Sequence, residues 1–388
     1  MPDRQADVRF PLHGLSGVLI LPRMIFFQDV TRVRRAAAAA LVAALAVAAA
    51  AGSGTAASTQ TTAGANLAPT KSYLLSHSAK LRSFTARFQR EAGLYDALAK
   101  RAGYDYAALW RSRRAAVRPI IARAKALWIE GNPYYERVEG VVAGTPSLAV
   151  YDVILDAGSS AKEDPASAVP FDLKLADGRT LRKPGNLYNL TEGMLWGTRP
   201  ELTARVRADL DGDGKVEFGE VLPDARVFRA AADAFALYVR KLDRSARKWK
   251  PTASDAFTAV VVMVPTMSEY FGQWKASRFV LGARANGDAF NVVSRLSDIG
   301  DILGGLRVIY AGIRPAIANV DRPQAAQTKR ELDSLWQFVS KLRAQEARGK
   351  RFTPQQADSL GRTAQERATA IAGQVTQAAA RLKVKIAQ

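Results

Sequence analysis

The chain has 388 residues, of which 48% are hydrophobic and 24% charged, a globular composition with ample length for a large core. It contains no cysteine, which excludes disulfides and thiol chemistry, and its formal net charge is +20. The 56 Lys and Arg residues are dispersed along helical segments and accompany no nucleic-acid-binding motif, so we expect no nucleic-acid partner. We interpret them mainly as solvated helix faces, with attraction to anionic envelope surfaces as a secondary role.

Residues 1–57 are typical of an upstream segment followed by a secretory signal peptide. Residues 36–51 form an unbroken apolar run, and small residues follow up to Ala57, as signal-peptidase cleavage requires. The positive region before the run consists of Arg32, Arg34 and Arg35. Because the run is short and Ala-rich for a membrane anchor, we predict a periplasmic or secreted protein that starts at Met24. It would meet the membrane only through this signal peptide.

The remainder is predicted to be a disordered Ser/Thr/Ala/Gly linker over residues 58–70 and one helical domain over residues 71–388. Apolar residues at helical spacing predict helices over 71–100, 104–130, 134–142, 187–195, 224–247, 254–281, 286–318, 324–347 and 354–385. Residues 131–133 (Gly-Asn-Pro) are expected to end the second helix, and Pro265 and Pro315 to kink or end theirs. The predicted fold is an all-α antiparallel helical bundle that could divide into two four-helix-bundle halves.

One segment departs from the helical pattern. Residues 171–182 alternate apolar and polar side chains around an Asp177-Gly178 turn, which predicts a small β-hairpin. The bundle should therefore carry one β-hairpin excursion.

Residues 209–220 match the twelve-residue EF-hand-type calcium loop. Gly214 stands at loop position 6, where the chain must turn sharply. Lys215 would ligate through its carbonyl, Glu217 through a water and Glu220 with both carboxylate oxygens. The predicted ligands are Asp209, Asp211, Asp213, Lys215, Glu217 and Glu220. An acidic surface turn is the alternative, but it leaves four of the carboxylate positions unexplained.

The calcium site is expected to be structural. The loop is single, whereas such loops usually pair, and the following helix is expected to restart at residues 223–224 with Pro223 in its first turn. Extracellular loops of this kind bind calcium with dissociation constants of about 10⁻⁴ to 10⁻³ M. An exported protein would keep such a loop loaded, fixing the chain on either side and holding Glu192 opposite the rest of the bundle.

Three segments of the chain resemble segments of a known protein family. Residues 132–139 (Asn-Pro-Tyr-Tyr-Glu-Arg-Val-Glu) resemble the Tyr-Glu-Arg-Ile-Glu segment of the imelysin-like family, which includes imelysin proteins and the periplasmic component of the Efe iron-uptake system. Residues 189–197 resemble the family segment with His-x-x-Glu followed by Leu-Trp-Gly, and residues 269–279 resemble a downstream segment. The resemblance covers about residues 70–385.

The resemblance implies an exported helical protein whose inward carboxylates hold a metal such as iron, with an envelope iron-uptake system as partner. The chain departs from the family at Asn189, which stands where the family has its His, and His77 is the only histidine after residue 57. A two-His zinc peptidase needs two imidazoles, so we predict no such activity.

A second, all-oxygen metal site remains possible on the segments that carry the resemblance. Its candidate residues are Glu136, Glu139, Asn189, Glu192 and Glu269. Glu136 and Glu139 share a helix face, and such ligands suit iron or another hard metal. In the alternative interpretation, the carboxylates pair with Arg137, Arg278 or other cations as a scaffold.

The sequence therefore predicts an exported calcium-binding protein that is not an enzyme, with calcium structural and a second metal, iron, as a further ligand. Two rivals stay open. The first is a carboxylate-metal hydrolase, which three or more carboxylates around one open point would favour. The second is a basic envelope-interaction protein without a small ligand, whose binding to anionic polymers would weaken with salt.

Overall fold

The structure is a computed structural model that describes residues 62–285 and 290–387. The predicted signal peptide, residues 1–57, lies outside the described residues, as do residues 58–61. No helix in the described part of the chain has both the length and the apolar character needed to cross a membrane. The architecture is all-α with two small antiparallel β-pairs, which confirms the predicted fold class.

The first helical half is built on α2, α3 and α6. These span Ala68–Arg101, Tyr106–Gly144 and Ala225–Lys248, and α2 packs against both of the others. The chain between α3 and α6 forms the shorter elements α4 (Ala149–Asp152), the π-helix η1 (Val153–Ala157), β1 (Leu173–Lys174), β2 (Thr180–Leu181), α5 (Leu187–Leu195), η2 (Pro200–Leu202), β3 (Thr203–Arg207) and β4 (Val221–Pro223).

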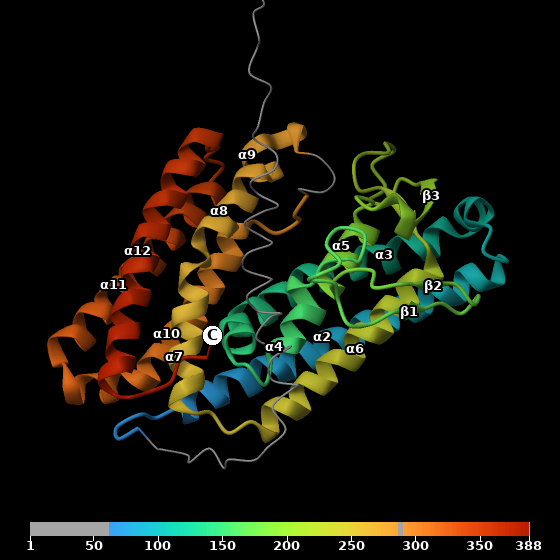
Figure 1. The fold of residues 1–388 in the computed structure, drawn as a ribbon. Helices are drawn as coiled ribbons and strands as arrows, with labels where there is room; N and C mark the ends of the chain where they lie inside the picture. The colour runs from blue at the N-terminus through green and yellow to red at the C-terminus, as the bar shows by residue number, and fades with distance from the viewer. Residues whose placement is uncertain (1–61, 286–289, 388) are drawn as a thin grey trace, which may run out of the picture.

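The second half, drawn in yellow to red in Figure 1, follows α6. Its elements are α7 (Ala253–Met263), η3 (Val264–Thr266), α8 (Met267–Ala276), α9 (Arg278–Leu281), η4 (Gly282–Arg284), α10 (Arg295–Val320), α11 (Arg322–Ala347) and α12 (Pro354–Arg381). Within it, α10 packs on α11 and α12 packs on α8. The two halves meet where α3 lies against α10 and α7.

The predicted hairpin is confirmed. Leu173 pairs with Leu181 and Lys174 with Thr180 in antiparallel register. Gly178 adopts φ +87° in the turn, a conformation that glycine enters without a Cβ clash. The Asp177 Oδ1 atom accepts a hydrogen bond from the Arg179 N–H at 3.1 Å, which supports the same turn.

The predicted helix end at residues 131–133 is wrong, because α3 continues through Pro133 to Gly144. Gly131 lies so close to α2 that an added Cβ would meet the Phe84 ring at 2.6 Å. Asn132 and Glu136, in the turn that contains Pro133, are buried as well. Packing on both sides of this turn therefore outweighs the hydrogen bond that proline cannot make.

Other boundaries can be compared with the prediction, and the helix predicted to begin at residue 286 begins only at Arg295. Part of the predicted linker over 58–70 is wrong, since α2 begins at Ala68 and Leu67 is buried. The predicted helix over 254–281 is interrupted at Pro265, as expected for proline, by the 3₁₀ turn η3. Pro315, in contrast, lies inside α10, which continues to Val320.

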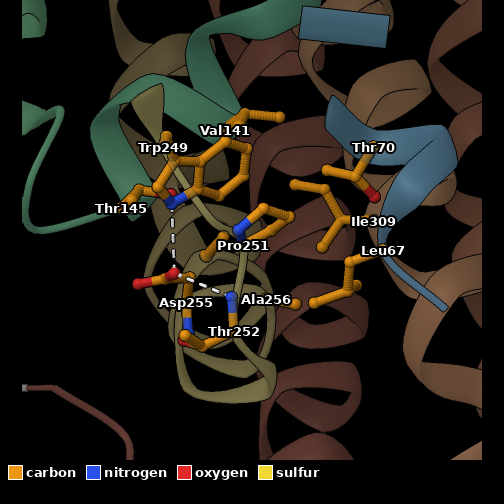
Figure 2. Close-up of a pocket in the computed structure, with 11 residues that line it drawn as sticks. Leu67, Thr70, Val141, Thr145, Trp249, Pro251, Thr252, Asp255, Ala256 and Ile309 are labelled. Carbon is orange, nitrogen blue, oxygen red and sulfur yellow. Dashed lines mark hydrogen bonds between the residues drawn. The ribbon is translucent and has the colours of Figure 1, made fainter. Parts of the chain in front are cut away.

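A small apolar pocket marks one end of the contact between the halves, beside the connection from α6 to α7 (Figure 2). Val141, Trp249 and Ile309 contribute to its wall. Asp255 closes one side, accepting hydrogen bonds from Trp249 Nε1 at 3.1 Å and from the Thr252 N–H at 3.0 Å. The lining is nearly all apolar, so we interpret this pocket as a packing gap and not as a metal site.

The closest approach between the halves allows a direct test. A Cβ at Gly305 would lie 2.2 Å from the Arg137 carbonyl oxygen of α3, whereas one at the preceding Gly304 would meet only Trp336 Nε1, at 3.8 Å. We expect Gly305→Ala to lower the free energy of unfolding by about 1–3 kcal/mol through overpacking. Gly304→Ala is the control and should be neutral or stabilising, by up to about 1 kcal/mol, because alanine favours helix. Urea unfolding measures both; equal effects would contradict the close packing.

Candidate metal centres

The predicted calcium loop connects β3 to β4. Thr203 pairs with Pro223 and Arg207 with Val221, so the strands bring the two ends of the loop together. The expected helix start at residues 223–224 is wrong: Pro223 ends β4, and α6 begins at Ala225. Asp224 caps α6 through hydrogen bonds from the Arg226 and Val227 N–H groups, which explains why the helix begins after the proline.

Three of the six predicted ligands come together. Asp209, Asp211 and Asp213 each offer a carboxylate oxygen, and these atoms lie within 4.8 Å of one another. Gly214 adopts φ +87° at the predicted sharp turn. Three carboxylates converging on one exposed point provide the hard oxygen donors that calcium prefers.

The other predicted ligands lie differently. Glu217 is exposed and Lys215 lies on the loop surface. Glu220 is buried, and its carboxylate accepts hydrogen bonds from backbone N–H groups of the loop itself: Leu210 at 2.7 Å and Asp211 at 3.1 Å to Oε1, and Glu217 at 2.7 Å to Oε2. Glu220 therefore braces the loop from inside.

Two cations of α3 anchor the loop, and sequence reasoning identified neither of them. Arg118 donates to the Asp209 carbonyl oxygen at 2.8 Å and to Asp209 Oδ2 at 2.7 Å. Two turns later Lys125 Nζ donates to the Gly219 carbonyl oxygen at 2.8 Å. These partners are about ninety residues from the loop, so no local spacing rule could have identified them.

A second acidic cluster lies inside the protein, at the junction of the halves. Glu136 and Glu139 of α3 and Asp156 of η1 each offer a carboxylate oxygen within 4.8 Å of the others. Only 1% of Glu136 and 3% of Glu139 is exposed. The sequence predicted the two glutamates as neighbours on one helix face but missed Asp156 of the π-helix η1.

Several carboxylate oxygens of Glu136 and Glu139 lack a hydrogen-bond donor among the described residues. Both carboxylate oxygens of Glu136 and Oε2 of Glu139 are buried and receive no hydrogen bond from an N–H or O–H donor of the described residues. The other oxygen of Glu139 accepts from the Tyr270 hydroxyl at 2.6 Å. A buried carboxylate that lacks partners is strongly destabilising when ionised. The cluster therefore needs protons or a cation.

The remaining predicted ligands are arranged around the cluster. Asn189 and Glu192 line a small polar cavity together with Asp156, and the cavity measures about 10 Å³, roughly the space of one water. Glu192 Oε1 accepts the Val292 N–H at 2.6 Å. Glu269 lies outside the cluster, on α8, and accepts from Gln273 Nε2 at 3.1 Å.

The scaffold interpretation paired Glu136, Glu139 and Glu192 with Arg137 or Arg278. Among the described residues, neither arginine forms a direct ion pair with these glutamates. Arg137 pairs with Asp301 at 3.4 Å, and Arg278 donates to the Val292 carbonyl oxygen at 3.2 Å. Arg295 is the cation that comes nearest to this scaffold role, because it forms an ion pair with Asp298 at 2.9 Å in the wall of the polar cavity. Among the described residues, Arg295 attracts Asp298, Asp156, Glu136 and Glu192, and Arg278 also attracts Glu192. The carboxyl groups therefore outnumber these two cations.

Burial shifts the titration of these carboxyl groups upward. Burial, reinforced by neighbouring acids, raises the pKa of Glu136 and Glu139 well above the usual range. Burial also raises the pKa of Asp152 and of Glu192 to about 7, and that of Asp298 to about 6 although Arg295 opposes the shift. Desolvation dominates each case, as expected for carboxylates removed from water.

A comparison with known protein families identifies the family of this chain. The model of the peptidase M75 family, described as imelysin, matches residues 35–380. This chain belongs to the imelysin family. A search of curated proteins gave no match. Within this imelysin-family fold the buried acidic cluster lies where the two halves meet, and Asn189 stands beside it in place of the expected histidine.

His77 is the one histidine in the described part of this imelysin-family chain. It is buried on α2, where its Nδ1 atom lies 2.9 Å from the Tyr73 carbonyl oxygen. Burial lowers the pKa of this imidazole. It forms part of the α2 packing and does not join either acidic cluster.

The raised carboxyl pKa values predict how stability depends on pH. A carboxyl group whose folded pKa lies above its unfolded value of about 4 stabilises the fold fully below that value and loses this contribution as the pH rises through the folded pKa. The free energy of unfolding of the metal-free protein should therefore fall between about pH 5 and pH 8.

Urea unfolding across this pH range measures the effect. Glu136→Gln removes one buried ionisable group and should flatten the profile, while the exposed Glu201→Gln should leave it unchanged. Stability that rises with pH across the range would contradict this account of the cluster.

Proposed function

We propose that this imelysin-family protein is exported and binds two kinds of metal: a structural calcium ion in the loop 209–220, and a hard metal such as iron at the buried cluster. The observation that carries the second site is the pair of buried, unpartnered oxygens of Glu136 beside Glu139 and Asp156. A cation would satisfy these oxygens and remove their mutual repulsion.

The calcium site rests on the loop sequence and on the meeting of its three aspartates. Asp209, Asp211 and Asp213 would hold calcium, with Lys215, Glu217 and Glu220 as further donors in the loop pattern. The loop joins two strands and is tied to α3 by Arg118 and Lys125. These attachments suit a structural ion that fixes the loop against the first half.

The second site would take a hard metal because all its donors are oxygens. Glu136, Glu139 and Asp156 supply carboxylates, which suit manganese, magnesium, calcium or ferric iron better than zinc or copper. Iron is the metal implied by the family resemblance, and an envelope iron-uptake system would then be the partner. A two-imidazole zinc centre lacks its ligands in the described residues, whose one histidine is His77.

A carboxylate-metal hydrolase is the second candidate, and the three convergent carboxylates favour it. The adjoining cavity has room for about one water, which is what a metal-bound nucleophile would require. Binding remains the better-supported function, because the cluster is buried and the cavity could not also hold a substrate.

Calcium should stabilise the protein by mass action. With a dissociation constant of about 10⁻⁴ to 10⁻³ M, 10 mM calcium stabilises the folded state by about 1.4–2.7 kcal/mol, which raises the melting temperature by a few degrees. Thermal melts in calcium and in EGTA measure this. The Asp211→Asn variant should lose the shift, and Asp358→Asn, on the exposed surface of α12, should keep it. Identical wild-type melts in calcium and EGTA would contradict a structural calcium.

Removing one buried carboxylate should weaken the second site. With the loop saturated by millimolar calcium, we expect Glu136→Gln to reduce manganese affinity at least about tenfold, since one of three charged ligands is lost. Glu201→Gln is the control and should change affinity little, because Glu201 is an exposed residue of η2. Electron paramagnetic resonance of free manganese measures both; equal affinities in Glu136→Gln and wild type would contradict the site.

A further inference from the structure

The calcium loop touches the chain that covers the buried acidic cluster. Phe218, at loop position 10, leaves 65% of its surface exposed, yet its ring centroid lies 5.0 Å from that of Phe290. Phe290 is buried and lies just before the N-terminus of α10. An aromatic side chain of the loop thus rests on a segment more than seventy residues away.

That segment forms part of the wall around Glu192. The Val292 N–H, two residues after Phe290, donates to Glu192 Oε1 at 2.6 Å. Arg278 holds the same segment from the other side: its guanidinium lies 5.3 Å from the Phe290 ring centroid and donates to the Val292 carbonyl oxygen at 3.2 Å. Residues 290–292 therefore connect Phe218 to Glu192 through these contacts, and Asn291 within this segment lines the polar cavity.

The loop also contacts Trp196, which packs against a residue that lines the cavity. The backbone at Gly219 is packed against Trp196, whose Cδ1 atom would lie 3.3 Å from an added Cβ. Lys125, which holds Gly219, also lies 5.6 Å from the Trp196 ring centroid. Trp196 in turn packs edge to face on Trp128, which lines the cavity and donates through Nε1 to Thr191 at 2.9 Å.

We infer that the calcium loop is a positioning element for the buried metal site, with Phe218 as the residue that transmits its conformation to the wall around Glu192. This inference rests on the proposed calcium and second-metal sites. Because the two sites share this wall, calcium bound in the loop raises the affinity of the buried site for a hard metal, and the buried metal raises calcium affinity by the same factor.

The calcium-free and calcium-bound forms of the loop would differ in what the Glu220 carboxylate binds. Its carboxylate accepts the N–H groups of Leu210, Asp211 and Glu217 in this structure. If Glu220 exchanges these N–H groups for the ion, as its loop position predicts, residues 217–219 rearrange, and these residues include both contacts to the cavity walls. Calcium thus selects between two arrangements of the same loop, and Phe218 and Gly219 carry the difference.

Hydrogen exchange of the full protein, followed by mass spectrometry, tests the coupling without a second metal. Peptides covering 209–220 report calcium binding, and a peptide covering 290–295 reports the Val292 amide that bonds to Glu192. In the wild type, calcium should slow exchange in both peptides, by about fivefold or more at Val292, the lower end of typical coupling. In Phe218→Ala, which removes a mostly exposed side chain, calcium should still protect 209–220 but no longer 290–295.

Val216→Ala is the matched control, because Val216 is also an exposed apolar residue of the loop; both peptides should respond to calcium as in the wild type. Protection of 209–220 without any change in 290–295 of the wild type would overturn the coupling and leave the calcium site intact. No protection in either peptide would overturn the calcium site and the coupling with it.

Manganese binding gives the second readout. In saturating calcium, Phe218→Ala should bind manganese about fivefold more weakly than wild type or Val216→Ala, although Phe218 touches none of the cluster carboxylates. Equal manganese affinity in all three proteins would overturn the positioning role. A wild type that binds calcium but no manganese would instead remove the second site and, with it, the coupling.

Discussion

The main constraint on this structure is a group of carboxyl side chains that are buried away from water. Glu136, Glu139 and Asp156 converge at the junction of the two helical halves, and the oxygens of Glu136 receive no hydrogen bond from a donor in the described part of the chain. Ionised groups in such a place repel each other and lack solvation, so they must be protonated or must hold a cation. The fold thus maintains a site whose empty and charged form is unfavourable, which is the property expected of a metal-binding centre.

Helix α3 links the features that define this centre. Its first part carries Arg118 and Lys125, which hold the calcium loop, and its later part carries Glu136 and Glu139. The same later part packs on α10 of the second half, where Gly305 permits the backbones to approach closely. Because α3 continues through Pro133, the contacts to the loop, the buried cluster and the contact between the halves all lie on one helix.

Much of this organisation could be predicted from the sequence. Helical periodicity gave the all-α class, alternation around Asp177-Gly178 gave the hairpin, and the spacing of Asp209, Asp211 and Asp213 correctly grouped their carboxylates. These are local patterns, and local patterns are what a sequence displays directly. The family resemblance likewise agreed with the imelysin match over residues 35–380.

The failures of prediction all involve tertiary contacts. Asp156 enters the cluster through a π-helix, and Glu269 stays outside it although its segment resembled the family. Arg118 reaches Asp209 from another helix. Proline spacing also predicted an end for α3 that packing against Phe84 overrides. No sequence window contains both partners of these contacts.

The central claim is that this imelysin-family protein carries a metal in its buried carboxylate cluster as well as calcium in its loop. Elemental analysis of protein purified from its native source without chelators tests this most directly, with the Glu136→Gln variant purified in parallel. The account predicts calcium together with a hard transition metal such as iron or manganese in the wild type, and calcium alone in the variant. Calcium alone in both proteins, or no metal in either, would contradict it.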